Sequence, residues 1–99
     1  MDLQQLAIIH LFYNQLLMEI YTASVKKEFQ DESDIKNEIK KWILKHKKNK
    51  KFGNKCRHEI IFISKEIDKA NIKEFRCKVA NLERNCRIIK INMESKTIR

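Results

Sequence analysis

Apolar residues recur at every third or fourth position through the first third of the chain, which is the spacing of one face of an α-helix. No glycine or proline interrupts this stretch. The pattern therefore predicts one long helix over residues 3–29. Its regular apolar face is formed by Leu6, Ile9, Tyr13, Leu16 and Ile20.

Other apolar residues lie off this face, so the expected helix is apolar nearly all round. They are Ile8, Leu11, Phe12 and Leu17. A small domain seldom covers a helix on every side, and monomers rarely leave large apolar patches in water. Either this is the central helix of the fold, or a second copy of the chain covers part of it. We expect a two-fold homodimer with Ile8 and Phe12 at the interface. Glutamate at both positions would then give a soluble monomer, whereas it would unfold the chain if they are core residues.

The polar stretch QDES at 30–33 interrupts the pattern, and Asp31 or Ser33 can cap a second helix. This helix is expected from about Asp34 to Lys48. Acidic residues stand near its start and lysines near its end, as the helix dipole prefers. Its apolar-to-mixed face comprises Ile35, Ile39, Trp42, Ile43 and His46.

The second half of the chain contains two short isoleucine-rich runs, EIIFIS at 59–64 and CRIIKINM at 86–93. Short apolar runs of this composition are typical of buried strands. In the second run Ile89 and Ile91 also alternate with polar residues, which is strand spacing. We therefore expect a strand at each of these two places.

Residues 68–84, between the two runs, fit two patterns. Ile72, Phe75, Val79 and Leu82 follow helical spacing, whereas Phe75, Cys77 and Val79 alternate as a strand would. The helical pattern covers more residues, so a helix is favoured. The predicted fold class is α+β: two N-terminal helices followed by a small β-α-β element. The alternative is two helices followed by a three-stranded antiparallel meander.

The composition describes a folded domain with a highly charged surface, because 42% of the residues are apolar and 35% are charged. With 99 residues, no proline and the single glycine Gly53, the chain is expected to form one compact domain over 1–99. Three cysteines are too few, and odd in number, for a disulfide scaffold, so reduced thiols are expected. No signal peptide is visible, and the apolar run at 6–21 is short and polar for a membrane span. These features indicate an intracellular protein.

Charge is concentrated in one segment, KKWILKHKKNKKFGNKCRH at 40–58. It holds nine lysines and arginines and no acidic residue, whereas the other 13 basic residues are balanced by 13 acidic ones. The whole net charge of +9 therefore resides in this segment. Its cationic residues are Lys40, Lys41, Lys45, Lys47, Lys48, Lys50, Lys51, Lys55 and Arg57.

This basic segment predicts contact with phosphates, since lysine-rich surfaces bind polyanions by releasing counterions. Lysine outnumbers arginine here, and base readout favours bidentate side chains, so phosphates are expected rather than bases. Trp42 and Phe52 interleave with the lysines, but Trp42 shares the face of Ile39 and Ile43 and is expected in the core. The simplest alternative is that the segment is a solvated helix end that keeps the protein in solution.

The leading hypothesis is a non-enzymatic protein that binds DNA or RNA non-specifically through residues 40–58. The alternative function is a protein–protein interaction module that docks on an acidic host protein, in which case charge would govern association rate and partner choice.

Metal binding and catalysis have little support. Four potential zinc ligands exist, Cys56, His58, Cys77 and Cys86, with His46 as a spare, but their spacing is unlike that of zinc sites. A Cys56–His58 nucleophile pair is conceivable, yet paired carboxylates and a glycine-rich phosphate loop are lacking. No metal, cofactor or catalytic residue is therefore expected. His10, within the apolar helix, is expected to be a hydrogen-bonded core residue.

In overall style the chain resembles the small orphan proteins of viruses and phages, which are compact, highly charged and rich in Ile, Lys, Glu and Asn. In composition alone, the segment MDLQQLAIIHLFYNQLLMEIY and the lysine-rich middle resemble small proteins from filamentous viruses of archaea that live in hot acid. The resemblance implies an intracellular viral protein, in the host cell, whose role is either nucleic-acid binding or inhibition of a host protein. It assigns no functional residue.

Overall fold

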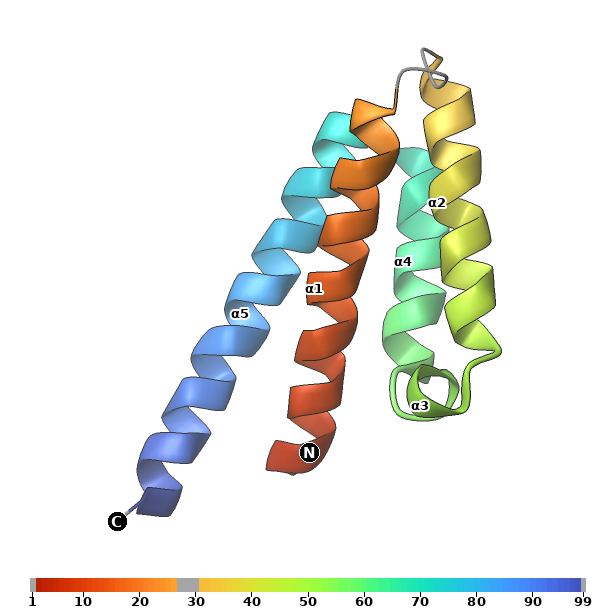
Figure 1. Cartoon of the computed structure of the whole chain (residues 1–99). Helices are drawn as coiled ribbons and strands as arrows, with labels where there is room; N and C mark the ends of the chain where they lie inside the picture. Colours follow the sequence, from red (N-terminus) through yellow and green to blue (C-terminus); the bar gives the residue numbers. More distant parts are fainter. Residues whose placement is uncertain (1, 27–30, 99) are drawn as a thin grey trace.

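A computed structural model describes residues 2–26 and 31–98, and every element in these ranges is a helix. The long helices are α1 (Leu3–Val25), α2 (Glu32–Lys47), α4 (Arg57–Lys69) and α5 (Ile72–Ile98). A single turn, α3 (Lys50–Gly53), joins α2 to α4. The long helices alternate in direction and form an up-down-up-down bundle (Figure 1).

The predicted α+β class is wrong, because the described residues contain no strand. The run at 59–64 lies inside α4, and the run at 86–93 lies inside α5. In α4, Ile60, Ile63 and Ile67 follow helical spacing and are all buried. Core packing of this face outweighs the weak preference of isoleucine for strands. Both the β-α-β arrangement and the three-stranded meander are thereby excluded.

The region 68–84, which fitted two patterns, is helical from Ile72 onward, as favoured. Between α4 and α5 the chain turns at Ala70 and Asn71. The Asn71 side chain accepts a hydrogen bond from the Glu74 backbone N–H at 2.8 Å, which caps α5. The Glu32 carboxylate at the start of α2 accepts a second one, from the Ile72 N–H at 2.7 Å. The starts of α2 and α5 are thus joined at one end of the bundle.

The two predicted N-terminal helices are confirmed within the described residues. Helix α1 ends at Val25, and positions 27–29 of the expected helix lie outside the described part of the chain. Asp31 is the N-cap of α2, and its carboxylate accepts from the Ser33 N–H at 3.2 Å. All five residues of the expected apolar face of α1 are buried, together with Phe12 and Ala23.

Helices α1 and α5 pack antiparallel along much of their lengths, as Figure 1 shows. His10 of α1 and Glu83 of α5 are joined by a 2.7 Å contact between Nε2 and Oε2, and both side chains are mostly buried. The Cys86 thiol donates weakly to the Leu6 carbonyl oxygen at 3.6 Å. His10 is therefore hydrogen-bonded, as expected, to a partner on the last helix, but it lies at the edge of the core and is only partly buried.

Candidate nucleic-acid interface

The basic segment forms one end of the bundle, where the second half of α2, the α3 turn and the start of α4 meet (Figure 1). All nine of its cationic side chains are exposed. We call this set of nine residues the basic surface. The sequence prediction placed it at 40–58. In the structure, Lys45 to Arg57 lie at the neighbouring ends of α2 and α4, whereas Lys40 and Lys41 lie midway along α2.

Aromatic side chains anchor the basic surface to the core. The Phe12 ring of α1 lies 5.8 Å from the Trp42 ring and 5.7 Å from the Phe52 ring, measured between centroids. His46 stacks on Trp42 at 3.8 Å, and its Nδ1 is 2.9 Å from the Trp42 carbonyl oxygen. Phe52 is buried and Trp42 is partly buried. These rings therefore pack against the core below the basic surface, and they do not form an exposed surface on which bases could stack.

Gly53 allows the turn after α2 to fold back closely. A Cβ atom at this position would lie only 2.5 Å from the Lys47 carbonyl oxygen. The Gly53 N–H donates to the Asn49 carbonyl at 2.7 Å, and the Cys56 N–H donates to the Phe52 carbonyl at 2.8 Å. No described residue has a positive φ, so the glycine is required here for close backbone approach and not for a left-handed conformation.

Most cations of the basic surface carry charge that no acid offsets. Lys40 is the exception, because its ammonium group pairs with the Asp68 carboxylate of α4 at 2.5 Å. Within the described ranges, the other eight have no carboxylate within ion-pair distance. Lys51 lies over the Phe52 ring, with its Nζ 5.6 Å from the centroid. Eight unpaired cations at one end of a small domain create a strongly positive local potential.

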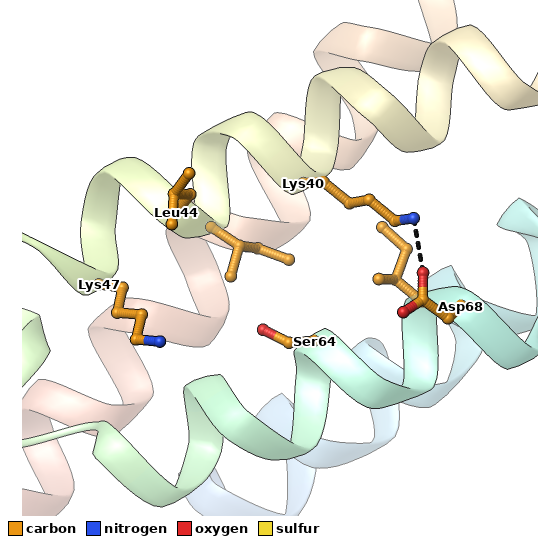
Figure 2. Close-up of a pocket in the computed structure, with 7 residues that line it drawn as sticks. Lys40, Leu44, Lys47, Ser64 and Asp68 are labelled. Carbon is orange, nitrogen blue, oxygen red and sulfur yellow. Dashed lines mark ion pairs between the residues drawn. The ribbon is translucent and has the colours of Figure 1, made fainter.

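A hollow of about 300 Å³ separates α2 from α4 beside the basic surface (Figure 2). Lys40 and Asp68 meet across it, while Lys47 extends over it from α2. A second hollow of about 330 Å³ continues from Lys47 to Asn54 and Arg57. We call the two together the α2–α4 groove. Its apolar lining consists of Ile43, Leu44, Ile60, Ile61 and Ile67.

The sequence did not reveal this groove or the role of Asp68. A strand at 59–64 would not place one face of isoleucines against α2, so the predicted strand gave no indication of a groove there. The signal was nevertheless present, because Ile60, Ile63 and Ile67 are spaced by three and four residues.

The cysteines do not form a reactive or metal-binding cluster. Cys56 is buried, and burial together with nearby Glu59 and Cys86 raises the pKa of its thiol to about 12. Burial also raises the pKa of Cys86. Since the thiolate is the nucleophile, the Cys56–His58 pair has no support at neutral pH. Cys77 is exposed on α5, and no group of three or more potential ligands for a metal was found in the part of the chain that the structure describes.

The two residues expected at a dimer interface have different surroundings. Phe12 is fully buried within the single chain, so its prediction as an interface residue is corrected: it is a core residue. Ile8 is partly buried and packs against the core. The dimer itself stays a prediction, but Phe12 cannot be part of its contact surface.

Comparisons with known proteins give no further assignment: no protein-family model, curated protein or solved structure matches the chain. Among the described residues, no helix is both long enough and apolar enough to cross a membrane.

Proposed function

We propose that the protein is a non-enzymatic nucleic-acid-binding protein that holds phosphate backbones with its basic surface. The observation that carries this proposal is the set of eight exposed cations that have no acidic partner among the described residues. Nucleic acid carries condensed counterions, and cations that are free to neutralise its phosphates release these ions, which drives binding. Viral origin and an intracellular location in the host cell remain part of the proposal.

Contact is expected with the backbone of DNA or RNA and not with base edges. The aromatic side chains of this region face inward, so they offer no stacking surface for single-stranded bases. Arg57 is the only arginine among the nine cations, and lysine acts as a point charge without the fork that reads guanine. The protein should therefore bind many sequences with similar affinity.

The test is a gel-shift titration with generic duplex DNA, duplex RNA and a single strand at several salt concentrations. If about five phosphates are contacted, the plot of log K against log salt has a slope near −4.5. Affinity then falls roughly several hundred-fold between 50 and 200 mM salt. Binding that ignores salt, or the absence of binding at 50 mM salt, contradicts the proposal.

A charge-matched pair of variants locates the binding site. In the first, Lys47, Lys48, Lys50 and Lys51 of the basic surface are changed to glutamate. In the control, glutamate replaces four exposed lysines elsewhere: Lys65, Lys69, Lys73 and Lys96. Both variants lose the same net charge. Binding should be abolished only by the first, and equal losses in both would mean that net charge alone attracts the nucleic acid.

The α2–α4 groove favours a second candidate function, recognition of an acidic protein partner. Its floor is apolar and its rim carries Lys47 and Arg57, which suits a helix with one apolar and one acidic face. Leu44 lines the groove and is 52% exposed, so Leu44→Asp should fold normally. This variant should lose a protein partner recovered from nuclease-treated host lysate, yet retain nucleic-acid binding. A blank gel shift together with a Leu44-dependent partner would favour the second function.

A further inference from the structure

The outward face of α1 lacks charge in a chain where 35% of residues are charged. Between Leu3 and Val25, Glu19 is the only Asp, Glu, Lys or Arg. Among the large hydrophobic residues whose burial is described, the three highest exposures nevertheless belong to this helix: Met18 at 70%, Tyr21 at 67% and Val25 at 57%. An exposed apolar patch on an otherwise charged domain indicates a binding surface.

These residues belong to a regular stripe opposite the buried face of α1. Their spacing alternates between three and four residues, as it does at the contact positions of a two-stranded coiled coil. We call this stripe the neutral face. It consists of Ala7, Leu11, Asn14, Met18, Tyr21 and Val25.

We propose that the neutral face of α1 binds the neutral face of a second copy of the chain. Each copy carries a net charge of +9, so two copies repel each other least when the contact itself brings no like charges together. An acidic partner would gain nothing from a face without cations. A membrane surface is also a poor match, since helices that lie on membranes carry Lys and Arg beside their apolar residues.

The two α1 helices run parallel in this dimer because of Asn14. In a parallel pair, equal positions of the seam meet, so Asn14 lies opposite Asn14 of the partner subunit. An amide both donates and accepts, and such a pair is self-complementary. In an antiparallel pair, Tyr21 would lie opposite Leu11 of the partner subunit, and Asn14 would lie opposite Met18 of the partner subunit. The Asn14 amide would then have no hydrogen-bond partner in an apolar contact.

The outward face of α5 is the strongest competing surface, and charge excludes it. Ile88 and Ile91 are 49% and 53% exposed and follow the same spacing. Arg84 lies on the same face, and Arg87 stands beside it. Two copies that met here in parallel would bring like charges together. The α5 pair therefore provides a matched control for the α1 seam.

The first experiment measures the mass of the chain by light scattering at micromolar concentration. The wild type should have the mass of two chains of 12.0 kDa each. Met18→Glu with Tyr21→Glu should give one chain with an unchanged helical circular dichroism spectrum, because both side chains are exposed in the single chain. Ile88→Glu with Ile91→Glu should remain dimeric. A monomeric wild type, or a double α1 variant that stays dimeric, overturns the proposal.

The second experiment tests the orientation by disulfide formation. Cys77 is the only exposed cysteine in the described part of the chain, so the background is Cys77→Ser. In a parallel dimer, Tyr21→Cys chains, which keep Asn14, should cross-link to one another on mild oxidation. In the antiparallel alternative they would not, whereas a mixture of Tyr21→Cys and Leu11→Cys chains would form the mixed dimer. That result, or no cross-link in either sample, contradicts the parallel arrangement.

Discussion

The basic surface and the neutral face of α1 are built on adjoining parts of one bundle but have opposite chemistry. The first contains nine exposed cations, eight of them without an acidic partner in the part of the chain that the structure describes. The second is a helical stripe without a charge along α1, and it carries the three most exposed of the described large hydrophobic residues, Met18, Tyr21 and Val25. A polyanion suits the first surface, and an uncharged partner suits the second.

The two surfaces should therefore respond differently to solution conditions. Binding at the basic surface depends on counterion release and weakens steeply with salt. Contact at the neutral face depends on removal of apolar area from water, and added salt screens the repulsion between the two +9 chains. Salt therefore separates the two activities, because it weakens nucleic-acid binding while it leaves or strengthens the dimer.

The largest expected effect comes from Phe12, the residue through which α1 supports the basic surface. Phe12→Ala removes the ring that contacts Trp42 and Phe52 and should lower the free energy of unfolding by about 3–5 kcal/mol. Phe62→Ala is the matched control, because Phe62 is 43% exposed on α4. It should cost less than about 1 kcal/mol. Chemical denaturation measures both, and equal losses would show that Phe12 is not a core residue.

The next effect concerns the backbone beneath the basic surface. Gly53→Ala places a Cβ against the Lys47 carbonyl oxygen and should cost about 1–3 kcal/mol, since backbone must move to accept it. The displaced turn should also weaken nucleic-acid binding. Asn54→Ala, at the exposed neighbouring position, serves as the control and should leave both unchanged. An unaffected melting temperature in Gly53→Ala would contradict the close approach.

A smaller effect is expected from the ion pair between Lys40 of the basic surface and Asp68. Asp68 is the only described carboxylate that pairs with one of the nine cations. Asp68→Asn frees Lys40 and should increase affinity for duplex DNA by about 1 kcal/mol, or roughly fivefold, with a salt slope steeper by up to about 0.9. Asp34→Asn makes the same change of charge at the exposed start of α2. If both variants bind equally tightly, the Lys40–Asp68 pair has no specific role.

The smallest effect lies beside the neutral face, at the one charged residue of α1. Burial raises the pKa of Glu19, and nearby Glu38 raises it further, against the opposing influence of Lys26 and His46. A raised carboxyl pKa means that the folded state binds the proton more tightly. Stability is therefore lost as pH rises through the range between the unfolded and folded pKa values.

Glu19→Gln should accordingly raise the melting temperature slightly at neutral pH and leave it unchanged below the pKa of an unfolded glutamate. Glu74→Gln, at an exposed position of α5, should show no such pH-dependent gain. Melting curves at pH 3 and pH 7 measure the difference, with unfolded glutamate near 4.3 as the reference. A loss of stability in Glu19→Gln at neutral pH would contradict the sign.

The sequence alone was sufficient for the first half of the molecule. In α1 and α2 the apolar periodicity, the Asp31 cap and the charge order along the helix all favour the same structure, so local and tertiary preferences agree. The exposure of the basic surface was equally predictable. Nine cations within nineteen residues cannot be buried without acidic partners, and this segment contains none.

The second half was decided by tertiary structure. An isoleucine-rich run of six to eight residues has no unambiguous period, and the cost of isoleucine in a helix is below about 1 kcal/mol per residue. Burial of Ile60, Ile63 and Ile67 against the bundle outweighs that cost. In α5 only Cys86 of the run at 86–93 is buried. The helix continues through the run because extending an existing helix is far easier than starting one.

The two faces of α1 show the same division within one helix. The sequence determined that α1 has more apolar surface than one face can hold, but not which residues the bundle covers. Packing against Trp42 and Phe52 buries Phe12, whereas no other described helix covers Met18 and Tyr21. Periodicity places side chains around a helix axis, and only the positions of neighbouring helices decide which of those side chains leave water.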